Sequence, residues 1–321
     1  MTKPAVPQVD PIVAKLDALV CVSPDLKPIA VLYAAILPLL RDADLRVEPV
    51  TLTVEQACVK LQAGVPLLHN ALLAFDETAA RALMIGLARA VEELPENAPT
   101  PRQRARLFQR AAPDTSALSE IARADHAQRV ATARQIRLAL EQNNLEINTL
   151  LPHVANSNSE FITARAKDLQ LDPGLLWTLA QNSVRPALRA WAKQLAPLAR
   201  GNAWDKGDCI ICGATATLGE LQDNSQVKHL RCGQCGADWQ TRRLACTFCG
   251  NDDPRTLTFL FAPKQREHRQ IQACDRCRAY LKLIAAFSPT PPEMLAIEDL
   301  ATLHLDYIAQ ERGYARGGIQ M

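Results

Sequence analysis

Residues 209–250 read CIICGATATLGELQDNSQVKHLRCGQCGADWQTRRLACTFCG, and residues 274–277 read CDRC. Eight of the ten cysteines in the chain lie in these two stretches, and all eight fall into Cys-x-x-Cys pairs. The pairs are Cys209/Cys212, Cys232/Cys235, Cys246/Cys249 and Cys274/Cys277. So many paired thiols in so short a segment need a common explanation, and that explanation decides how the C-terminal part of the chain folds.

Three explanations compete for the paired thiols. Disulfides persist in oxidising compartments and usually staple small secreted domains. A thioredoxin-like redox motif uses one pair at the start of a helix, where the helix dipole lowers the thiol pKa. Two four-cysteine metal sites, each built from two pairs separated by a loop, account for all eight thiols. We therefore predict metal binding, with the ligands Cys209, Cys212, Cys232, Cys235, Cys246, Cys249, Cys274 and Cys277.

The spacing within each pair suits a metal ion. Two residues between the ligands let one tight turn aim both sulfurs at an ion about 2.3 Å away. Gly213, Gly236 and Gly250 follow the second cysteine of the first three pairs and supply the positive φ that such a turn needs. Arg278 holds the same place after the fourth pair. We expect four metal knuckles, of which the fourth is the least regular.

The pairs can share ions in consecutive order or in a cross-braced order, and the sequence leaves both open. Residues Val227–Arg231 before the second pair and Leu257–Phe261 after the third are rich in strand-forming residues and bounded by turn formers. They favour a hairpin within each half and hence consecutive pairing. The predicted fold is therefore two tandem rubredoxin-like (zinc-ribbon) modules, residues 201–243 and 244–288, followed by a C-terminal helix and tail, residues 289–321. We expect Trp239 and Tyr280 to cover apolar faces of these modules.

Residues 1–200 are predicted to form an all-α helical domain, because apolar residues recur at three- and four-residue spacing. Helices are expected to begin at Thr53 with Gln56, at Asp76, and at Asp172 before Pro173. The last long helix is predicted over residues 175–198, and residues 95–101 and 152–159 are predicted to be loops. The remaining cysteines, Cys21 and Cys58, are read as buried apolar residues.

Composition and charge narrow the function classes. The 321 residues include 36 Lys and Arg and 34 Asp and Glu, a formal charge of +2. Each site of four thiolates and one divalent ion would have a net charge of −2. With both sites filled, the formal charge of the chain would change from +2 to −2. That balance argues against a nucleic-acid partner, which requires clustered basic residues. The densest basic stretch, Arg102 to Arg110, is predicted to be a solvated helix face.

Targeting and catalytic signals are weak. The longest apolar run, Ile29–Leu40, is shorter than the roughly twenty residues of a membrane-spanning helix, and residues 1–7 do not read as a secretory signal. We therefore expect a cytoplasmic protein without membrane insertion.

The sequence has no glycine-rich phosphate loop, no His-Glu-x-x-His and no Gly-x-Ser-x-Gly. We predict no catalytic residues and no enzyme activity, and His229 and His268 are the alternative metal ligands nearest the cysteine pairs.

The cysteine segment resembles the formate dehydrogenase accessory protein family, FdhE. The matching features are Cys209–Gly213, Leu230–Cys235 with Trp239, Cys246 with Cys249, Cys274–Lys282, Asp299–Ala301 and Glu311–Arg316. The resemblance implies a cytoplasmic protein that holds iron or zinc, one ion per four-cysteine site. It also implies binding to the catalytic, molybdenum-containing subunit of respiratory formate dehydrogenase before export, in support of enzyme maturation.

Two functions follow as hypotheses. The first is a maturation protein whose metal modules shape a surface for the formate dehydrogenase subunit. The second is a redox-active iron protein that delivers electrons or sulfur chemistry to the enzyme during maturation, since four tetrahedral thiolates suit iron as well as zinc. Within the tail, Tyr314 and Arg316 are candidate partner contacts. The sequence leaves open whether the chain forms a homodimer.

Overall fold

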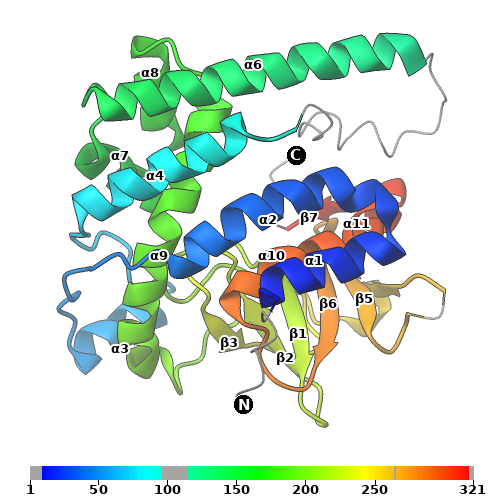
Figure 1. Ribbon diagram of the computed structural model, residues 1–321. Coiled ribbons are helices and arrows are strands. Elements are labelled where there is room, and N and C mark those ends of the chain that lie inside the picture. The colour runs from blue at the N-terminus through cyan, green and yellow to red at the C-terminus, as the bar shows by residue number, and fades with distance from the viewer. Residues whose placement is uncertain (1–8, 96–114, 264, 318–321) are drawn as a thin grey trace, which may run out of the picture.

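The computed structural model describes residues 9–95, 115–263 and 265–317 (Figure 1). The basic stretch from Arg102 to Arg110, the predicted loop beyond Pro95 and the last four residues of the tail lie outside these ranges.

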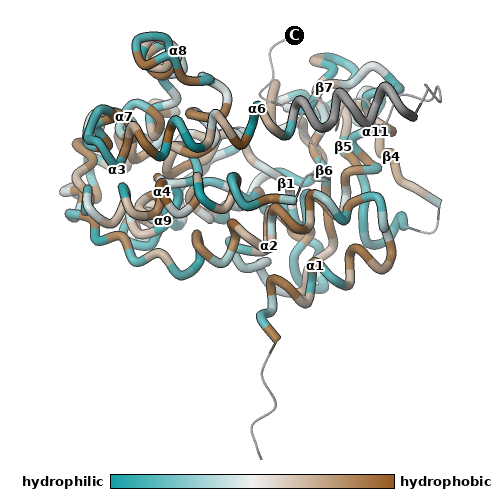
Figure 2. The backbone as a smooth tube through the Cα atoms, turned by 45° about the horizontal axis from the view of Figure 1, so that its top comes forward, coloured by the Kyte–Doolittle hydropathy of each residue, from teal (hydrophilic) through white to brown (hydrophobic). Residues whose placement is uncertain are grey.

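The N-terminal part is helical, as predicted. Within the described residues it consists of α1 (Pro11–Val22), η1 (Pro24–Leu26), α2 (Lys27–Asp42), α3 (Val54–Gln62), α4 (Glu77–Glu92), α6 (Thr115–Glu141), α7 (Ile147–Ala155), α8 (Ser159–Asp168) and α9 (Pro173–Ala199). Along α1, α2 and α9 the tube in Figure 2 alternates between brown and teal, the pattern of helices that bury one face. Helix α9 is the predicted last long helix.

The predicted helix starts are confirmed by their caps. Thr53 and Gln56 form a complete capping box at the start of α3, with Gln56 N donating to Thr53 Oγ1 at 3.2 Å. Asp76 accepts from the backbone of α4 at 2.9 Å, and Asp172 accepts from Leu175 N at 2.6 Å. Each side chain satisfies an N–H group that the first helical turn leaves without a partner.

Two predictions for the helical part are wrong. Residues 152–155 belong to α7 and not to a loop, because Leu150, Leu151 and Val154 are buried and hold the helix across Pro152. Cys21 is exposed, since on α1 it lies half a turn away from the buried face of Ile12. Cys58 is half-buried.

The C-terminal part forms one mixed sheet of seven strands. They are β1 (Leu218–Gln222), β2 (Val227–Arg231), β3 (Asp238–Gln240), β4 (Leu257–Leu260), β5 (Arg269–Cys274), β6 (Ala279–Ala286) and β7 (Ala315–Arg316). The order is β3-β2-β1-β6-β5-β4, with β7 beside β6. Strands β1 and β6 pair in parallel, as do β6 and β7, and the other pairs are antiparallel.

This sheet corrects the prediction of two separate tandem modules. The strands of the first four-cysteine segment and those of the second join where Gly219 lies opposite Leu283. A Cβ at Gly219 would come 2.5 Å from the Leu283 side chain, so the close approach depends on glycine. Joining the hairpins at β1 and β6 removes one exposed edge from each.

Two short helices and a strand end the described chain. Helix η3 (Pro292–Met294), α10 (Leu295–Ala301), α11 (Leu303–Glu311) and β7 stand where one helix and a tail were predicted. Tyr280 is buried and donates through its hydroxyl to Asp306 on α11 at 2.8 Å. Trp239 is also buried and donates to the Lys206 carbonyl at 3.1 Å.

The first helices of the chain and α10 meet beside the sheet. Helices α1 and α2 lie beside α10 in Figure 1, and Lys15 on α1 pairs with Glu298 on α10 at 2.5 Å. One apolar core runs from the helices into the first cysteine segment and includes Cys209, Cys232 and Cys235. The helical part and the first four-cysteine group therefore share a core. None of the helices in the described ranges combines the length and apolar content needed to cross a bilayer.

Candidate metal centre

The first four-cysteine group is assembled from two turns that flank β1 and β2. Its four Sγ atoms lie within 4.8 Å of one another. The Sγ atoms of Cys209 and Cys235 are 3.5 Å apart, and those of Cys212 and Cys232 are also 3.5 Å apart. We call this group the first centre.

The second group is built in the same way from the turns before β4 and after β5. Its Sγ atoms lie within 4.8 Å of one another, with 3.7 Å between Cys246 and Cys277 and 3.7 Å between Cys249 and Cys274. We call this group the second centre. The two groups are formed by consecutive pairs along the chain, the arrangement that the hairpin segments favoured.

The sulfur separations suit a tetrahedral ion. Four ligands at about 2.3 Å from one ion stand about 3.8 Å from each other, whereas a disulfide requires about 2.05 Å. All ten cysteines are free thiols in the structure. The donor set and its spacing therefore fit one divalent zinc or iron ion per centre and do not fit disulfides.

All four knuckles have the same backbone turn. The residue after each second cysteine has a positive φ, 78° at Gly213, 76° at Gly236, 72° at Gly250 and 59° at Arg278. Arg278 N donates to Cys274 O at 2.8 Å, the same hydrogen bond that Gly250 N makes to Cys246 O at 2.9 Å. The fourth knuckle is therefore as regular as the others. Hydrogen bonds from the Arg278 side chain to Arg312 O and Gly313 O help to hold the left-handed backbone there.

The two centres differ in exposure. In the first centre Cys209, Cys232 and Cys235 are buried and Cys212 is half-buried. In the second centre Cys249 and Cys277 are exposed. The second centre is therefore the more exposed of the two.

Burial and mutual hydrogen bonds spread the pKa values of the thiols. Burial raises the pKa of Cys209 and Cys235, while hydrogen bonds from Cys209, Cys212 and Cys235 lower the pKa of Cys232. In the second centre burial raises the pKa of Cys246 to about 11. Burial also raises the pKa of Cys274, but hydrogen bonds from backbone and side-chain donors outweigh it and bring the value to about 7. The pKa is thus lowered for one thiol of each centre, Cys232 in the first and Cys274 in the second.

Two arginines of α9 flank the first centre. Arg185 Nε donates to Gln234 Oε1 at 3.2 Å, and Gln234 lies between Cys232 and Cys235. Arg189 follows one helical turn later and donates to the Pro292 carbonyl at 3.5 Å; together with Cys235 and Gly236 it lines the same space. Burial lowers the pKa of both guanidinium groups.

A buried lysine stands beside the second centre. Lys228 on β2 donates through Nζ to the Ala245 carbonyl at 3.0 Å and to Gln272 Oε1 at 3.1 Å. Ala245 immediately precedes Cys246. Burial lowers the pKa of Lys228 to about 8. No sequence pattern marks Arg185, Arg189 and Lys228 as site residues, since single basic residues on a helix or strand are typical of solvated faces.

The other predicted site residues lie outside the centres. His229 pairs with Asp238, and His268 is exposed; neither belongs to a four-cysteine group. Tyr314 is buried and its hydroxyl donates to Asp275. Arg316 pairs with Asp299 at 2.5 Å. Both tail candidates for partner contact thus already make contacts within the chain.

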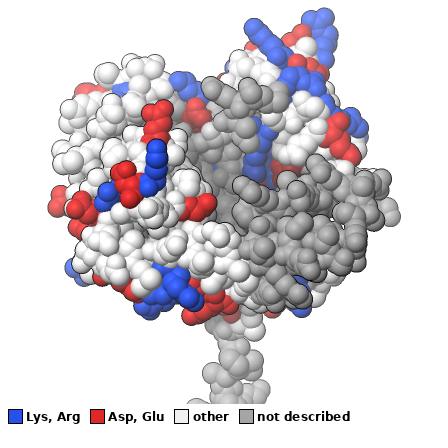
Figure 3. All heavy atoms as spheres, turned by 90° about the horizontal axis from the view of Figure 1, so that it is seen from above, with Lys and Arg blue, Asp and Glu red and all other residues white. Residues whose placement is uncertain are grey.

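Charges of both signs are mixed on one face of the described part of the molecule. On the side seen in Figure 3, blue and red atoms lie interspersed among white ones in the part that is drawn in colour. The ion pairs Arg137–Glu92 and Arg89–Glu141 are examples of this mixing. The pattern agrees with the balanced composition and provides no support for a nucleic-acid partner.

The fold and the centres define a class of proteins in which a helical part is joined to a mixed sheet, with two four-cysteine groups that could each hold a metal ion. Residues 244–321 match the family model described as FdhE, C-terminal domain. The expected resemblance to the FdhE family is thereby confirmed.

Individual relatives agree. The chain is 31% identical over 119 residues to the protein FdhE homolog of Aquifex aeolicus, a match that spans 35% of this chain and 40% of that protein. It is 24% identical over 177 residues to the protein FdhE homolog of Haemophilus ducreyi. This match covers 54% of this chain and 53% of that protein. These matches cover less than two thirds of the relatives' length.

A solved structure has the same fold. The crystal structure of the FdhE protein from Pseudomonas aeruginosa superimposes with a TM-score of 0.53, covering 95% of this chain and 91% of that one at 19% identity. At this identity the likeness concerns the fold.

Proposed function

We propose that the chain is a non-catalytic accessory protein for the maturation of formate dehydrogenase, and that it binds the catalytic subunit of that enzyme in the cytoplasm before export. The observation that carries the proposal is the pair of four-cysteine centres, the second of which lies in residues 244–321 that match the FdhE C-terminal domain. The centres would hold zinc or iron through Cys209, Cys212, Cys232 and Cys235 and through Cys246, Cys249, Cys274 and Cys277.

The donor set supports binding over catalysis. A tetrahedral ion with four thiolates has no open position for a substrate or a water molecule. The ions would therefore hold the turns around β1 and β2 and around β4 and β5 in place, and so shape the surface that a partner meets. The first centre would also fix the sheet to the helical part, because they share a core.

A pull-down tests this proposal. Metal-loaded protein serves as bait in an extract of cells that produce respiratory formate dehydrogenase, and mass spectrometry quantifies the catalytic subunit. A bait with Cys212→Ser and Cys249→Ser is the matched control, since it lacks one ligand in each centre. Recovery with the loaded bait and loss with the control are expected. A loaded bait that recovers no formate dehydrogenase subunit would count against the proposal.

The exposed second centre favours one alternative function, a redox-active iron protein. Iron held by four thiolates can change between the ferric and ferrous states by one electron, and exposure of Cys249 and Cys277 would let a partner approach. Protein purified without oxygen would then contain iron and change colour reversibly with dithionite and ferricyanide. A colourless zinc protein that still supports formate dehydrogenase activity would exclude this alternative.

A further inference from the structure

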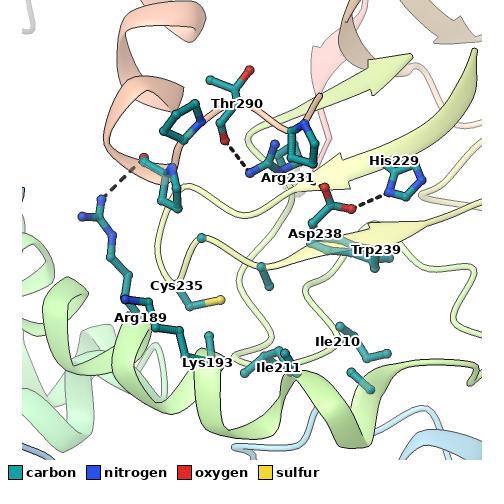
Figure 4. Close-up of a pocket in the computed structure, with 18 of the residues that line it drawn as sticks. Arg189, Lys193, Ile210, Ile211, His229, Arg231, Cys235, Asp238, Trp239 and Thr290 are labelled. Carbon is teal, nitrogen blue, oxygen red and sulfur yellow. Dashed lines mark hydrogen bonds and ion pairs between the residues drawn. The ribbon is translucent and has the colours of Figure 1, made fainter. Parts of the chain in front are cut away.

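A cleft of about 1370 Å³ lies between α9, the first centre and residues 289–293 (Figure 4). Arg189 and Lys193 of α9 line one side, and Asp238 and Trp239 of β3 line the other. Ile210 and Ile211 of the first knuckle also line the cleft.

The sequence of α9 explains the space. Ala192, Ala196 and Ala199 lie on the part of the helix that lines the cleft, where larger side chains would fill it. Pro289, Pro291 and Pro292 line the rim and restrict its backbone. The cleft is thus a built feature with a largely apolar lining.

Strand β3 forms an open edge of the sheet inside this cleft. It is the first strand in the order β3-β2-β1-β6-β5-β4, so only β2 pairs with it among the described residues. Asp238 and Gln240 are exposed, whereas Trp239 is buried. An exposed edge strand offers unpaired N–H and C=O groups to another extended chain.

The register identifies the free backbone groups. Thr241 N donates to Lys228 O at 2.9 Å, and in an antiparallel pair the residues that face the partner strand alternate. The backbone of Trp239 therefore faces β2, and the backbones of Asp238 and Gln240 face away from it. Within the described ranges, no hydrogen bond is made by the N–H groups of Asp238 and Gln240.

Basic side chains face the same space from α9. Arg189 and Lys193 lie one turn apart on α9, Arg200 is the C-cap residue of that helix, and all three line the cleft. None of them has an acidic ion-pair partner within the described residues. Four acidic side chains also line the cleft. Asp205 pairs with Arg242 and Asp238 lies 3.6 Å from Arg231, whereas Asp44 and Glu293 belong to no ion pair among the described residues.

We propose that this cleft binds an extended polypeptide segment with acidic side chains, which adds a strand to the β3 edge and meets the basic row of α9. Hydrogen bonds to the backbone of Asp238 and Gln240 hold the segment, and alternate side chains point to opposite faces of the enlarged sheet. The acidic side chains face Lys193 and Arg200, and the alternate side chains point to the opposite face. The identity of the segment rests on the proposed function, which makes it part of the formate dehydrogenase catalytic subunit.

A defined peptide tests the cleft without the enzyme. Fluorescence anisotropy follows binding of a labelled hexapeptide of alternating valine and glutamate to the full metal-loaded chain, with the valine–lysine hexapeptide as the charge control. The glutamate peptide is expected to bind at least about tenfold more tightly, a difference of about 1.4 kcal/mol that falls with added salt. Equal binding of the two peptides, or no binding of either at about 1 mM, would overturn the proposal.

Variants test the edge itself. Gln240→Pro removes an N–H group that β2 does not use, so the fold and metal content are kept while glutamate-peptide affinity falls about tenfold. Gln240→Ala keeps the N–H group and retains binding. Lys193→Glu weakens binding of the glutamate peptide, whereas Lys167→Glu on α8, outside the cleft, leaves that binding unchanged. Undiminished binding by Gln240→Pro that has kept its metal and its circular dichroism spectrum would refute strand addition.

The same variants separate this inference from the proposed function. If Gln240→Pro bait still recovers the formate dehydrogenase subunit as wild type does, the accessory role stands and the cleft is not its binding site. If wild type recovers no subunit but binds the glutamate peptide through Gln240, the cleft stands and the partner is another protein. A wild-type dimer that becomes a monomer only in Gln240→Pro would assign the edge to a second copy of the chain and overturn the proposal.

Discussion

Arg185 donates to Gln234 between two cysteines of the first centre, at a distance of 3.2 Å. Neither Arg185 nor Arg189 has an acidic ion-pair partner within the described part of the chain. Cations removed from water need a compensating charge, and four thiolates on a divalent ion carry −2. We therefore expect the two guanidinium groups to offset the negative charge of the first centre once an ion is bound.

Replacing both arginines should loosen the metal of the first centre. Arg185→Gln with Arg189→Gln is expected to weaken metal affinity there by about 10–100-fold, the range found when groups around metal ligands are removed. Competition with a chromophoric chelator measures the affinity of each centre. Lys167→Gln on α8 is the control. Equal metal affinity of the first centre in the double variant and in the control would show that Arg185 and Arg189 do not offset its charge.

The second centre should release its ion first. Cys249 and Cys277 are exposed, while three cysteines of the first centre are buried, so a chelator reaches the second centre more easily. Metal release into excess chelator is expected in two phases of equal amplitude. Cys249→Ser should remove the fast phase and Cys212→Ser the slow one. A single phase, or the reverse assignment, would show that exposure does not control release.

The centres should also differ in their contribution to stability. Cys232 belongs to the core that contains the helical residues, whereas Cys246 lies in a small separate cluster with Leu257 and Cys274. Cys232→Ser is expected to destabilise the helical part by about 3 kcal/mol or more, since it breaks both the core and the metal site. Cys246→Ser should unfold the β4–β5 region and spare the helices. Thermal unfolding followed by circular dichroism compares the two, and identical curves would show one cooperative unit.

Local patterns were sufficient for much of this fold. Pairs of cysteines two residues apart, capping residues such as Asp76, and the glycines after the knuckles act within one turn of the chain, so they can be recognised in the sequence. The joining of β1 to β6 could not be, because Gly219 and its partner Leu283 are distant in sequence and glycine is a poor strand former. Arg185 was missed for the same reason, since its contact with Gln234 exists only after folding.

Arg316 provides a test of whether the end of the chain is structural. Its guanidinium donates to Asp299 and to the Thr217 carbonyl at 2.6 Å, and so ties β7 to α10 and to the start of β1. Arg316→Ala should lower the free energy of unfolding by about 2 kcal/mol, because it leaves Asp299 with Lys282 alone. Urea denaturation measures the change. If the urea midpoint of unfolding is unaltered but the pull-down no longer recovers the formate dehydrogenase subunit, Arg316 contacts the partner instead.

His304 should make stability depend on pH near neutrality. Burial lowers its pKa, helped by the positive charges of Arg269 and Lys282, and its Nε2 lies 2.7 Å from Gln265 Oε1. With a lowered pKa in the folded state, the unfolded chain binds a proton more readily than the folded one. The contribution of His304 to folding stability is therefore complete above the pKa of histidine in the unfolded chain, about 6.5. It is lost as the pH falls below that value.

Urea denaturation of wild type and His304→Gln between about pH 7.5 and 5.5 measures this contribution, in a range that brackets the histidine titration. The stability difference between the two proteins should shrink towards the acid end, since only wild type has a ring to protonate. His69→Gln, at an exposed position, is the matched control, and its difference from wild type should not follow the same course. A wild-type advantage over His304→Gln that grows as the pH falls would mean that the folded chain favours the charged ring, contrary to its burial beside Arg269 and Lys282.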